Sequence, residues 1–149
     1  MIQISEVELS ESVLETLIQM SADWGAEESC HGYRKNEKAD IEGNRIFLAR
    51  VDGVTAGYLF GHTETSKKAS SIMPDGVSYF EIEEIYVKPE YRSRGIGKKL
   101  FVFAEKAVSD EVDYIMLSTA TKNWKAILRF YIDELDMSFW SARLFKKIK

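Results

Sequence analysis

The sequence predicts a mixed α/β domain, built on a central and mostly antiparallel sheet that is flanked by helices. Two β-rich stretches, 45–51 and 54–65, are joined by Asp52-Gly53 and read as a hairpin. A strand, a helix and a further strand follow over 77–119, which is typical of a βαβ unit. The chain has 149 residues, the size of one ordinary domain, so we expect a single domain over 1–149.

The N-terminal part predicts one strand and two helices. Ile2 and Ile4 alternate with polar residues as in a strand, and Ser10 is a plausible N-cap for the helix that follows. Apolar residues recur in that helix with a 3.6-residue period, at Val13, Leu14, Leu17 and Ile18. The polar segment 24–44 should hold a short second helix between loops.

The hairpin is the clearest element, because Asp-Gly suits a two-residue turn in which both residues need a positive φ. A polar loop is expected over 66–76. The stretch 77–87 is rich in β-branched and aromatic residues and predicts a third strand, which Pro89 would stop.

The C-terminal part predicts a helix from about 95 to 108, a strand over 113–119 and an amphipathic helix over 123–135. Met137 to Ile148 should close the chain as one or two strands. Antiparallel hairpins therefore come first and a parallel unit comes later, which favours a mixed sheet over a doubly wound parallel one.

Composition excludes several classes of function. Cys30 is the only cysteine and there are two histidines, so no internal disulfide can form and a zinc centre is disfavoured; we expect no metal. The net charge of −4 argues against nucleic-acid binding. No apolar run approaches the roughly 18 residues of a membrane span, and the first residues do not resemble a signal peptide. We therefore expect no membrane association and a cytoplasmic protein.

The most informative segment is the basic turn that opens the helix after the third strand of this group. Its residues are Arg92, Ser93, Arg94, Gly95, Ile96, Gly97, Lys98 and Lys99. The first backbone N–H groups of a helix have no internal partner and lie at the positive end of its dipole, which favours an anion there. Glycines at 95 and 97 would let a phosphate approach the backbone without meeting a Cβ atom.

Two other phosphate-binding patterns fail on these residues. A Walker loop requires Ser or Thr after its lysine, whereas Lys98 is followed by Lys99. A dinucleotide-binding turn requires a third glycine, where this chain has Leu100. What remains is a pyrophosphate held by backbone amides without a metal.

The run Arg92-x-x-Gly95-x-Gly97 resembles the signature of the GNAT superfamily of N-acetyltransferases, and the preceding strand and the order of elements resemble that family as well. The resemblance implies transfer of an acetyl group from acetyl-CoA to a primary amine of a small molecule, peptide or protein, by direct attack in a ternary complex. It implies that the amides of residues 94–99 bind the pyrophosphate. The main chain of Ile85 and Val87 would pair with the pantetheine arm, beside a strand bulge. A homodimer is common in the family.

The strand 81–87 also offers carboxylates for catalysis. A period of two places Glu81 and Glu83 on one face and Glu84 on the other. Some members of the family use a glutamate in this strand as the base, and Glu81 lies nearest that position, with Glu83 next. These glutamates are equally compatible with ordinary edge-strand charges.

The helix 123–135 resembles the later GNAT helix, in which an Asn near the start contacts pantetheine and a Tyr acts as the acid. Asn123 and Tyr131 match, although many members place the Tyr seven residues after the Asn and here the seventh residue is Phe130. Phe130 and Tyr131 could also be core aromatics. The alternative function is a non-catalytic acyl-CoA-binding sensor or interaction module; the carboxylates and Tyr131 favour catalysis.

Overall fold

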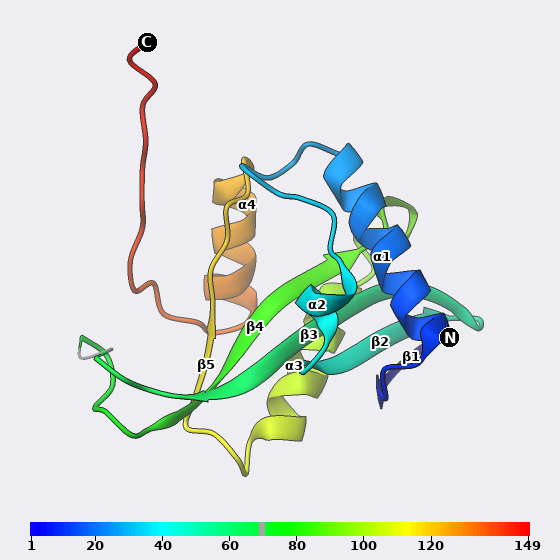
Figure 1. Cartoon of the computed structure of the whole chain (residues 1–149), viewed down its shortest axis with the longest axis horizontal. Coiled ribbons are helices and arrows are strands. Elements are labelled where there is room, and N and C mark those ends of the chain that lie inside the picture. The colour runs from blue at the N-terminus through cyan, green and yellow to red at the C-terminus, as the bar shows by residue number, and fades with distance from the viewer. Residues whose placement is uncertain (69–70) are drawn as a thin grey trace.

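The computed structural model describes residues 1–68 and 71–149 (Figure 1). Residues 69 and 70 of the predicted loop 66–76 lie outside the described residues. The strands are β1 (Ile2–Val7), β2 (Arg45–Val51), β3 (Val54–Thr65), β4 (Ser78–Val87) and β5 (Tyr114–Leu117). The helices are α1 (Glu11–Ala26), α2 (Lys38–Ile41), α3 (Ile96–Val108) and α4 (Trp124–Arg129), which continues as a π-helix over Phe130–Glu134.

The strands form one sheet in the order β1-β2-β3-β4-β5. The first four are antiparallel to their neighbours, and β5 pairs in parallel with β4. The mixed, mostly antiparallel sheet predicted from the sequence is thereby confirmed.

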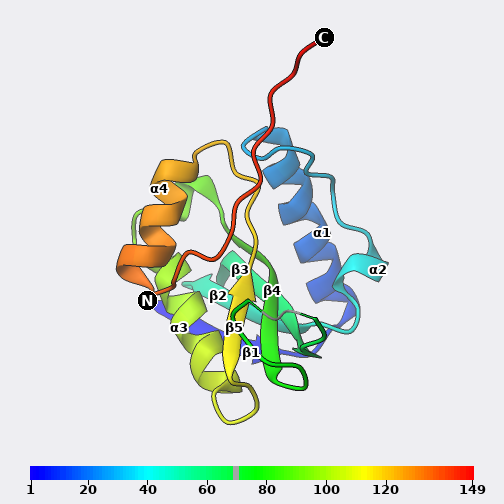
Figure 2. The same ribbon diagram turned by 90° about the vertical axis from the view of Figure 1, so that its left-hand side faces the viewer.

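Helices cover both faces of this sheet, as Figure 2 shows. On one face, α1 and α2 pack on a core that includes Leu17, Met20 and Tyr58. On the other face, α3 and the end of α4 pack on a core that includes Phe80 and Leu100. Among the described residues, no helix has the length and apolar character needed to cross a bilayer.

Local signals placed most elements correctly. The backbone N–H of Val13 donates to Ser10 Oγ at 3.1 Å, so Ser10 is the N-cap of α1. Asp52 and Gly53 have φ values of 49° and 84°, as the two-residue turn requires. The short helix in the segment 24–44 is α2.

Strand β4 contains a bulge at Glu83. Phe60 of β3 pairs with Glu84 whereas the next residue, Gly61, pairs with Ile82, so Glu83 is one extra residue. A Cβ atom on Gly61 would overlap the carbonyl oxygen of Glu81, and glycine therefore permits the close approach of the two strands here. After the bulge, the side chains of β4 lie on the opposite faces of the sheet from those that regular alternation would give them.

The predicted closing strand over 137–148 is wrong. Residues 137–149, called the tail below, form no helix or strand and extend away from the body of the molecule (Figures 1 and 2). A β-rich sequence becomes a strand only where it finds a partner strand, and the tail does not pair with β5 in this chain.

Candidate active site

The turn before α3 has the conformation of an anion-binding site. Ser93 and Gly95 both have positive φ values, 64° and 75°, and Gly95 is the N-cap of α3. Residues of this kind that alternate with residues of negative φ just before a helix start can direct their N–H groups into one concavity. A Cβ atom on Gly95 would meet no atom within 4 Å, so the space above this residue is open. The exposed side chains of Arg94 and Lys98 add positive charge.

Two residues that were predicted to help bind the pyrophosphate, Ile96 and Lys99, also have roles inside the protein. The N–H of Lys99 donates to the carbonyl of Gly95 at 3.0 Å, as in the first turn of any helix. This is the first hydrogen bond within α3, so the backbone N–H groups of Ile96, Gly97 and Lys98, which precede it, have no acceptor inside the helix and can bind an anion. Ile96 itself is buried, so its side chain belongs to the core.

Gly97 faces the last helix. A Cβ atom at this position would lie 3.5 Å from Phe130 Cζ, so Gly97 lies under the ring of Phe130. Of the two glycines, Gly95 therefore provides the open approach and Gly97 the packing between α3 and the end of α4.

Arg92 is directed away from the helix start, toward the end of α1. Its guanidinium group lies against both oxygens of Glu27, at 2.9 and 3.0 Å, and its Nε donates to the carbonyl of Val87 at 2.9 Å. Tyr86 also donates to Glu27, at 2.6 Å. Burial by itself raises the pKa of Glu27, but the hydrogen bonds from Arg92 and Tyr86 outweigh it, and the pKa lies below its usual value.

Strands β4 and β5 are paired only over a short length. Their register ends at Ile82 and Leu117, so residues 83–87 of β4 continue without β5. The chain after β5 pairs instead with the loop that follows α1: Cys30 forms a bridge with Thr121, and the N–H of His31 donates to the carbonyl of Ala120 at 2.9 Å. Because β5 diverges, the edge of β4 at Ile85 and Val87 has no strand beside it. This is the edge at which the family resemblance predicts that the pantetheine arm pairs.

Asn123 lies at the start of the last helical segment, and Tyr131 lies in its π-helical part. Tyr131 is buried, with 8% of its side chain exposed, and its hydroxyl donates to no other group of the described residues. Burial, with a smaller effect of the nearby Cys30, raises the pKa of Tyr131 to about 12. Asn123 is the exposed N-cap of α4, and its side chain makes no capping bond.

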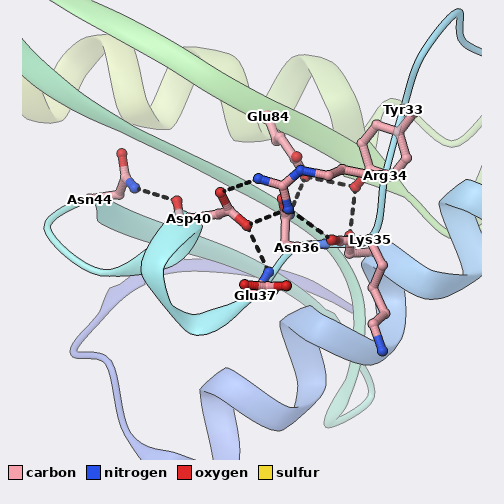
Figure 3. Close-up of polar contacts among 9 residues, drawn as sticks. Tyr33, Arg34, Lys35, Asn36, Glu37, Asp40, Asn44 and Glu84 are labelled. Atoms are coloured by element: carbon pink, nitrogen blue, oxygen red, sulfur yellow. Dashed lines mark hydrogen bonds and ion pairs between the residues drawn. The ribbon is translucent and has the colours of Figure 1, made fainter.

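The most elaborate polar network surrounds Glu84, and Figure 3 shows the loop residues Tyr33 and Asn36 directed at it. Glu84 Oε1 accepts hydrogen bonds from Tyr58 at 2.7 Å, from Asn36 at 2.9 Å and from Tyr33 at 3.2 Å. Ser21 lies 2.7 Å from the Tyr33 hydroxyl. Because Tyr33 donates its proton to Glu84, Ser21 donates to Tyr33. One carboxylate oxygen is thus fixed, and Oε2 accepts no hydrogen bond from the described residues.

Three carboxylates of β4 gather on the face that α1 and α2 cover. Glu81 pairs across the sheet with His62, and Glu83 Oε1 lies 3.5 Å from His62 Nδ1. Burial raises the pKa of Glu84, only partly opposed by its hydrogen bonds. Burial also raises the pKa of Glu81, with a further contribution from the charge of Glu83. The Oε2 atom of Glu81 is buried without a hydrogen-bond partner among the described residues.

The prediction that Glu84 lies opposite Glu81 and Glu83 is wrong. The extra residue of the bulge turns Glu84 onto their face and directs Ile85 and Val87 toward the α3 core instead. Sequence reasoning missed Glu84 for this reason. A bulge was expected in this strand, and the glycine at 61, inside a strand of the hairpin, is the signal that could have placed it at Glu83.

A hollow of about 390 Å³ lies beside these carboxylates. The side chains that line it are mostly acidic or polar, and they include Asp40, Glu42, Asn44, His62, Glu64 and Glu83. Arg34 pairs with Asp40 at 2.9 Å, and Lys38 lies 4.0 Å from Glu42. Among the described residues, no Lys or Arg lies within 4.0 Å of Glu64 or Glu83, which contact only the His62 ring, so this side of the sheet is rich in carboxylates.

The chain was compared with known proteins. The model of the acetyltransferase (GNAT) family matches residues 13–133. An uncharacterised N-acetyltransferase from Lactobacillus delbrueckii subsp. lactis is 38% identical over 64 residues, which is 43% of this chain and 35% of that relative.

Solved structures share the fold. A ribosomal-protein-alanine N-acetyltransferase from Brucella melitensis biovar Abortus 2308 has a TM-score of 0.67 and 19% identity, with 98% of this chain and 99% of that chain covered. The aminoglycoside N-acetyltransferase AAC(6')-Iy in complex with CoA also has a TM-score of 0.67, with 17% identity and 99% of both chains covered.

The fold, with its glycine turn and its divergent β4 and β5, agrees with the family match, and the aligned part of the curated relative is about a third of that relative's length. The chain belongs to the GNAT acetyltransferase family.

Proposed function

We propose that this chain transfers the acetyl group of acetyl-CoA to a primary amine, by direct attack of the amine while both substrates are bound. The observation that carries the proposal is that one strand, β4, both leads to the open, positive helix start at Gly95 and carries a half-buried carboxylate of raised pKa, Glu84, in the part that β5 no longer pairs.

The residues present fit acetyl-CoA. The amides of residues 94–98 and the side chains of Arg94 and Lys98 would hold the pyrophosphate, because the space above Gly95 is open and no Cβ atom obstructs it. The free length of β4, at Ile85 and Val87, would pair with the pantetheine arm, and Asn123 would contact it from α4. When bound, the cofactor supplies an activated acetyl group and a thiolate leaving group.

The chain's own residues would then manage two protons. Glu84 is our preferred base for the ammonium of the acceptor, because its Oε1 is fixed by three donors while Oε2 is left for the incoming proton. Glu81 and Glu83 stay in the proposal as alternatives. Tyr131 would protonate the leaving thiolate, since its raised pKa keeps the hydroxyl protonated at neutral pH.

For the acceptor we propose a positively charged amine, either a small molecule or a peptide. The anionic hollow beside Glu83 supports this, because uncompensated carboxylates attract a cation before it is deprotonated. Neighbours in fold include aminoglycoside acetyltransferases, which act on amines of this kind.

Thermal unfolding with acetyl-CoA, CoA and inorganic phosphate, followed by thiol release with a panel of amines, tests the proposal. We expect stabilisation by acetyl-CoA and CoA, and thiol release with at least one cationic amine. Stabilisation without thiol release across the panel would favour the non-catalytic sensor. Stabilisation by phosphate alone would overturn the assignment of the site to CoA.

A further inference from the structure

Tyr58 of β3 is the donor to Glu84 that the fold holds most firmly. Its side chain is fully buried, and its hydroxyl donates to Glu84 Oε1 at 2.7 Å, the shortest of the three hydrogen bonds that this oxygen accepts. The centre of its ring lies 5.7 Å from that of Phe60 and 5.9 Å from that of Tyr86. Because close packing on both sides leaves the ring no room to turn away, the hydroxyl has a fixed position.

The register of the sheet directs this hydroxyl to Glu84. Phe60 follows Tyr58 by two residues on the same face of β3, and it is Phe60 that pairs with Glu84 across the sheet. Tyr58 itself pairs with Tyr86, so it reaches Glu84 along the diagonal of that face, a distance that a long aromatic side chain spans. The contact depends on the bulge at Glu83, since regular alternation through that residue would turn Glu84 to the other face.

The other two donors to Glu84 come from outside the sheet. Tyr33 and Asn36 belong to the loop between α1 and α2, and Figure 3 shows both directed at the carboxylate. The backbone N–H of Asn36 donates to Ser21 Oγ of α1 at 2.8 Å, so its position depends on how the loop packs on that helix. Tyr33 is half-buried and makes the longest of the three bonds, at 3.2 Å. Of the three donors, Tyr58 alone lies on the strand beside β4.

These donors decide which oxygen of Glu84 takes a proton and how strongly. An oxygen that already accepts three hydrogen bonds has no lone pair left for a further proton, so Oε2 is the basic atom. Each donor also favours the charged form of the carboxylate. Burial raises the pKa of Glu84, and the donors oppose that rise, with the largest effect from Tyr58. Without the Tyr58 hydroxyl, Glu84 would therefore keep its proton to a higher pH.

Other charged and titratable groups face Glu84 from the elements packed against it. Asp40 of α2 raises the pKa of Glu84, and Arg34 of the loop pairs with Asp40 at 2.9 Å and compensates its charge. Burial, together with the charge of Glu84, raises the pKa of Tyr33 and of Tyr58 above the usual value, so both hydroxyls keep the proton that they donate. These groups stay in place when the Tyr58 hydroxyl is removed, so a changed titration of Glu84 reports on that hydroxyl.

We propose that Tyr58 is a positioning residue for acetyl transfer, which holds Oε1 of Glu84 so that Oε2 takes the proton of the acceptor amine. Because Tyr58 is fully buried, it acts through Glu84 and not on the acceptor or the cofactor. This inference rests on the proposed function, since it takes Glu84 as the base.

The pH profile of Tyr58→Phe tests this role. We expect the acid limb of kcat/KM for thiol release, measured with the amine of the panel that is turned over fastest, to move to higher pH. On the acidic side kcat/KM should fall about tenfold, whereas the KM for acetyl-CoA should stay at its wild-type value. Tyr86→Phe is the matched control, because it removes a hydroxyl from the same buried cluster that donates to Glu27 at 2.6 Å. Its acid limb should coincide with that of the wild type.

Carbon NMR of protein with labelled glutamate carboxyl groups follows Glu84 directly and needs no amine, with Glu84→Gln to assign the signal. We expect the carboxyl of Glu84 to titrate at higher pH in Tyr58→Phe than in the wild type or in Tyr86→Phe. Tyr33→Phe, which removes the longest of the three bonds, should move the titration in the same direction by less. This second variant keeps the test open if Tyr58→Phe does not fold.

An unmoved titration of Glu84 in Tyr58→Phe would overturn the proposal, even with a lower unfolding temperature, because Tyr58 would then serve the packing alone. A titration that moves while the acid limb of kcat/KM stays in place would overturn the role in the reaction for another reason, namely that Glu84 is not the base. That result, or no thiol release with any amine, is a failure of the proposed function, and the NMR titration distinguishes it from a failure of Tyr58 to control Glu84.

Discussion

The guanidinium group of Arg92 lies against the carboxylate of Glu27 with two contacts, of 2.9 and 3.0 Å, across 65 residues of sequence. This pair joins the glycine turn before α3 to the end of α1, from which the loop carrying Tyr33 and Asn36 departs. Glu27 is at the C-terminus of a helix, where a carboxylate is disfavoured by the helix dipole. Arg92 compensates that charge, and so holds the turn and this loop in one arrangement.

A double-mutant cycle measures this relationship. We expect Glu27→Gln and Arg92→Gln each to lower the free energy of unfolding, and the double variant to cost less than their sum, with a coupling of about 0.5–1 kcal/mol because both groups are partly exposed. Urea unfolding of the four proteins gives the coupling. Additive effects would mean that the two residues act independently.

The same pair should weaken in acid. The pKa of Glu27 is lower in the folded chain than its usual value. Its stabilisation is therefore complete above the usual glutamate pKa and is lost as the pH falls through the lower, folded value. The coupling measured by the cycle should disappear over that acidic range, and a coupling that persists there would point to packing rather than charge.

Glu84→Gln should separate catalysis from stability. We expect turnover to fall by about 10²–10⁴-fold, as for loss of a general base. Glu81→Gln and Glu83→Gln are the matched variants on the same strand. Steady-state rates with a responsive amine will show which of the three carboxylates is required. A wild-type rate for Glu84→Gln would remove Glu84 from the role of base.

The pH dependence of stability gives a second measure of Glu84. Its pKa is raised in the folded chain, so the folded state holds the proton over a range in which the unfolded state has lost it. Stability therefore falls as the pH rises through that range, and Glu84→Gln should escape the loss. We expect the unfolding temperature of the variant minus that of the wild type to rise as the pH increases from acidic to neutral. A constant difference across that range would contradict the raised pKa.

The two glycines of the turn should respond differently to alanine. Gly95→Ala should cost roughly 1–2 kcal/mol, because its φ of 75° is unfavourable for any residue with a Cβ atom. Gly97→Ala should gain about 0.5–1 kcal/mol from helix propensity, since its Cβ atom would be 3.5 Å from Phe130, an ordinary contact. Thermal unfolding of both variants tests this, and a large loss for Gly97→Ala would show that α3 and Phe130 cannot adjust.

Tyr131→Phe should affect turnover more than cofactor affinity. The hydroxyl donates to no group of the described residues, so its removal breaks no internal hydrogen bond and the fold should be retained. Calorimetry with acetyl-CoA and turnover with an amine are the two measurements. Equal turnover in both proteins would exclude Tyr131 as the acid, whereas parallel losses in affinity and rate would assign it to binding.

Local sequence signals were sufficient for most of the fold. The cap at Ser10, the turn at Asp52-Gly53 and the glycine turn before α3 each depend on residues within a few positions of one another. They were predicted because such signals require no knowledge of distant partners. The expected bulge in the strand 81–87 is likewise confirmed, at Glu83.

The features that were missed depend on distant contacts. The arginine of the signature, Arg92, pairs with Glu27, which belongs to a helix far earlier in the chain. The network of Glu84 joins three segments, and its side chain faces that network only because of the bulge. The tail has strand-like residues without a strand beside it in its own chain, and no local pattern reveals that absence.

The extra residue at Glu83 decides which faces of the sheet residues 84–87 occupy. If β4 ran through position 83 in regular alternation, every side chain from Glu84 to Val87 would exchange faces. A carboxylate would then enter the hydrophobic layer beneath α3, while Ile85 would emerge among the tyrosines that now hold Glu84. Deletion of position 83 would instead place Glu84 directly after Ile82, so that the two still alternate and residues 84–87 keep their present faces.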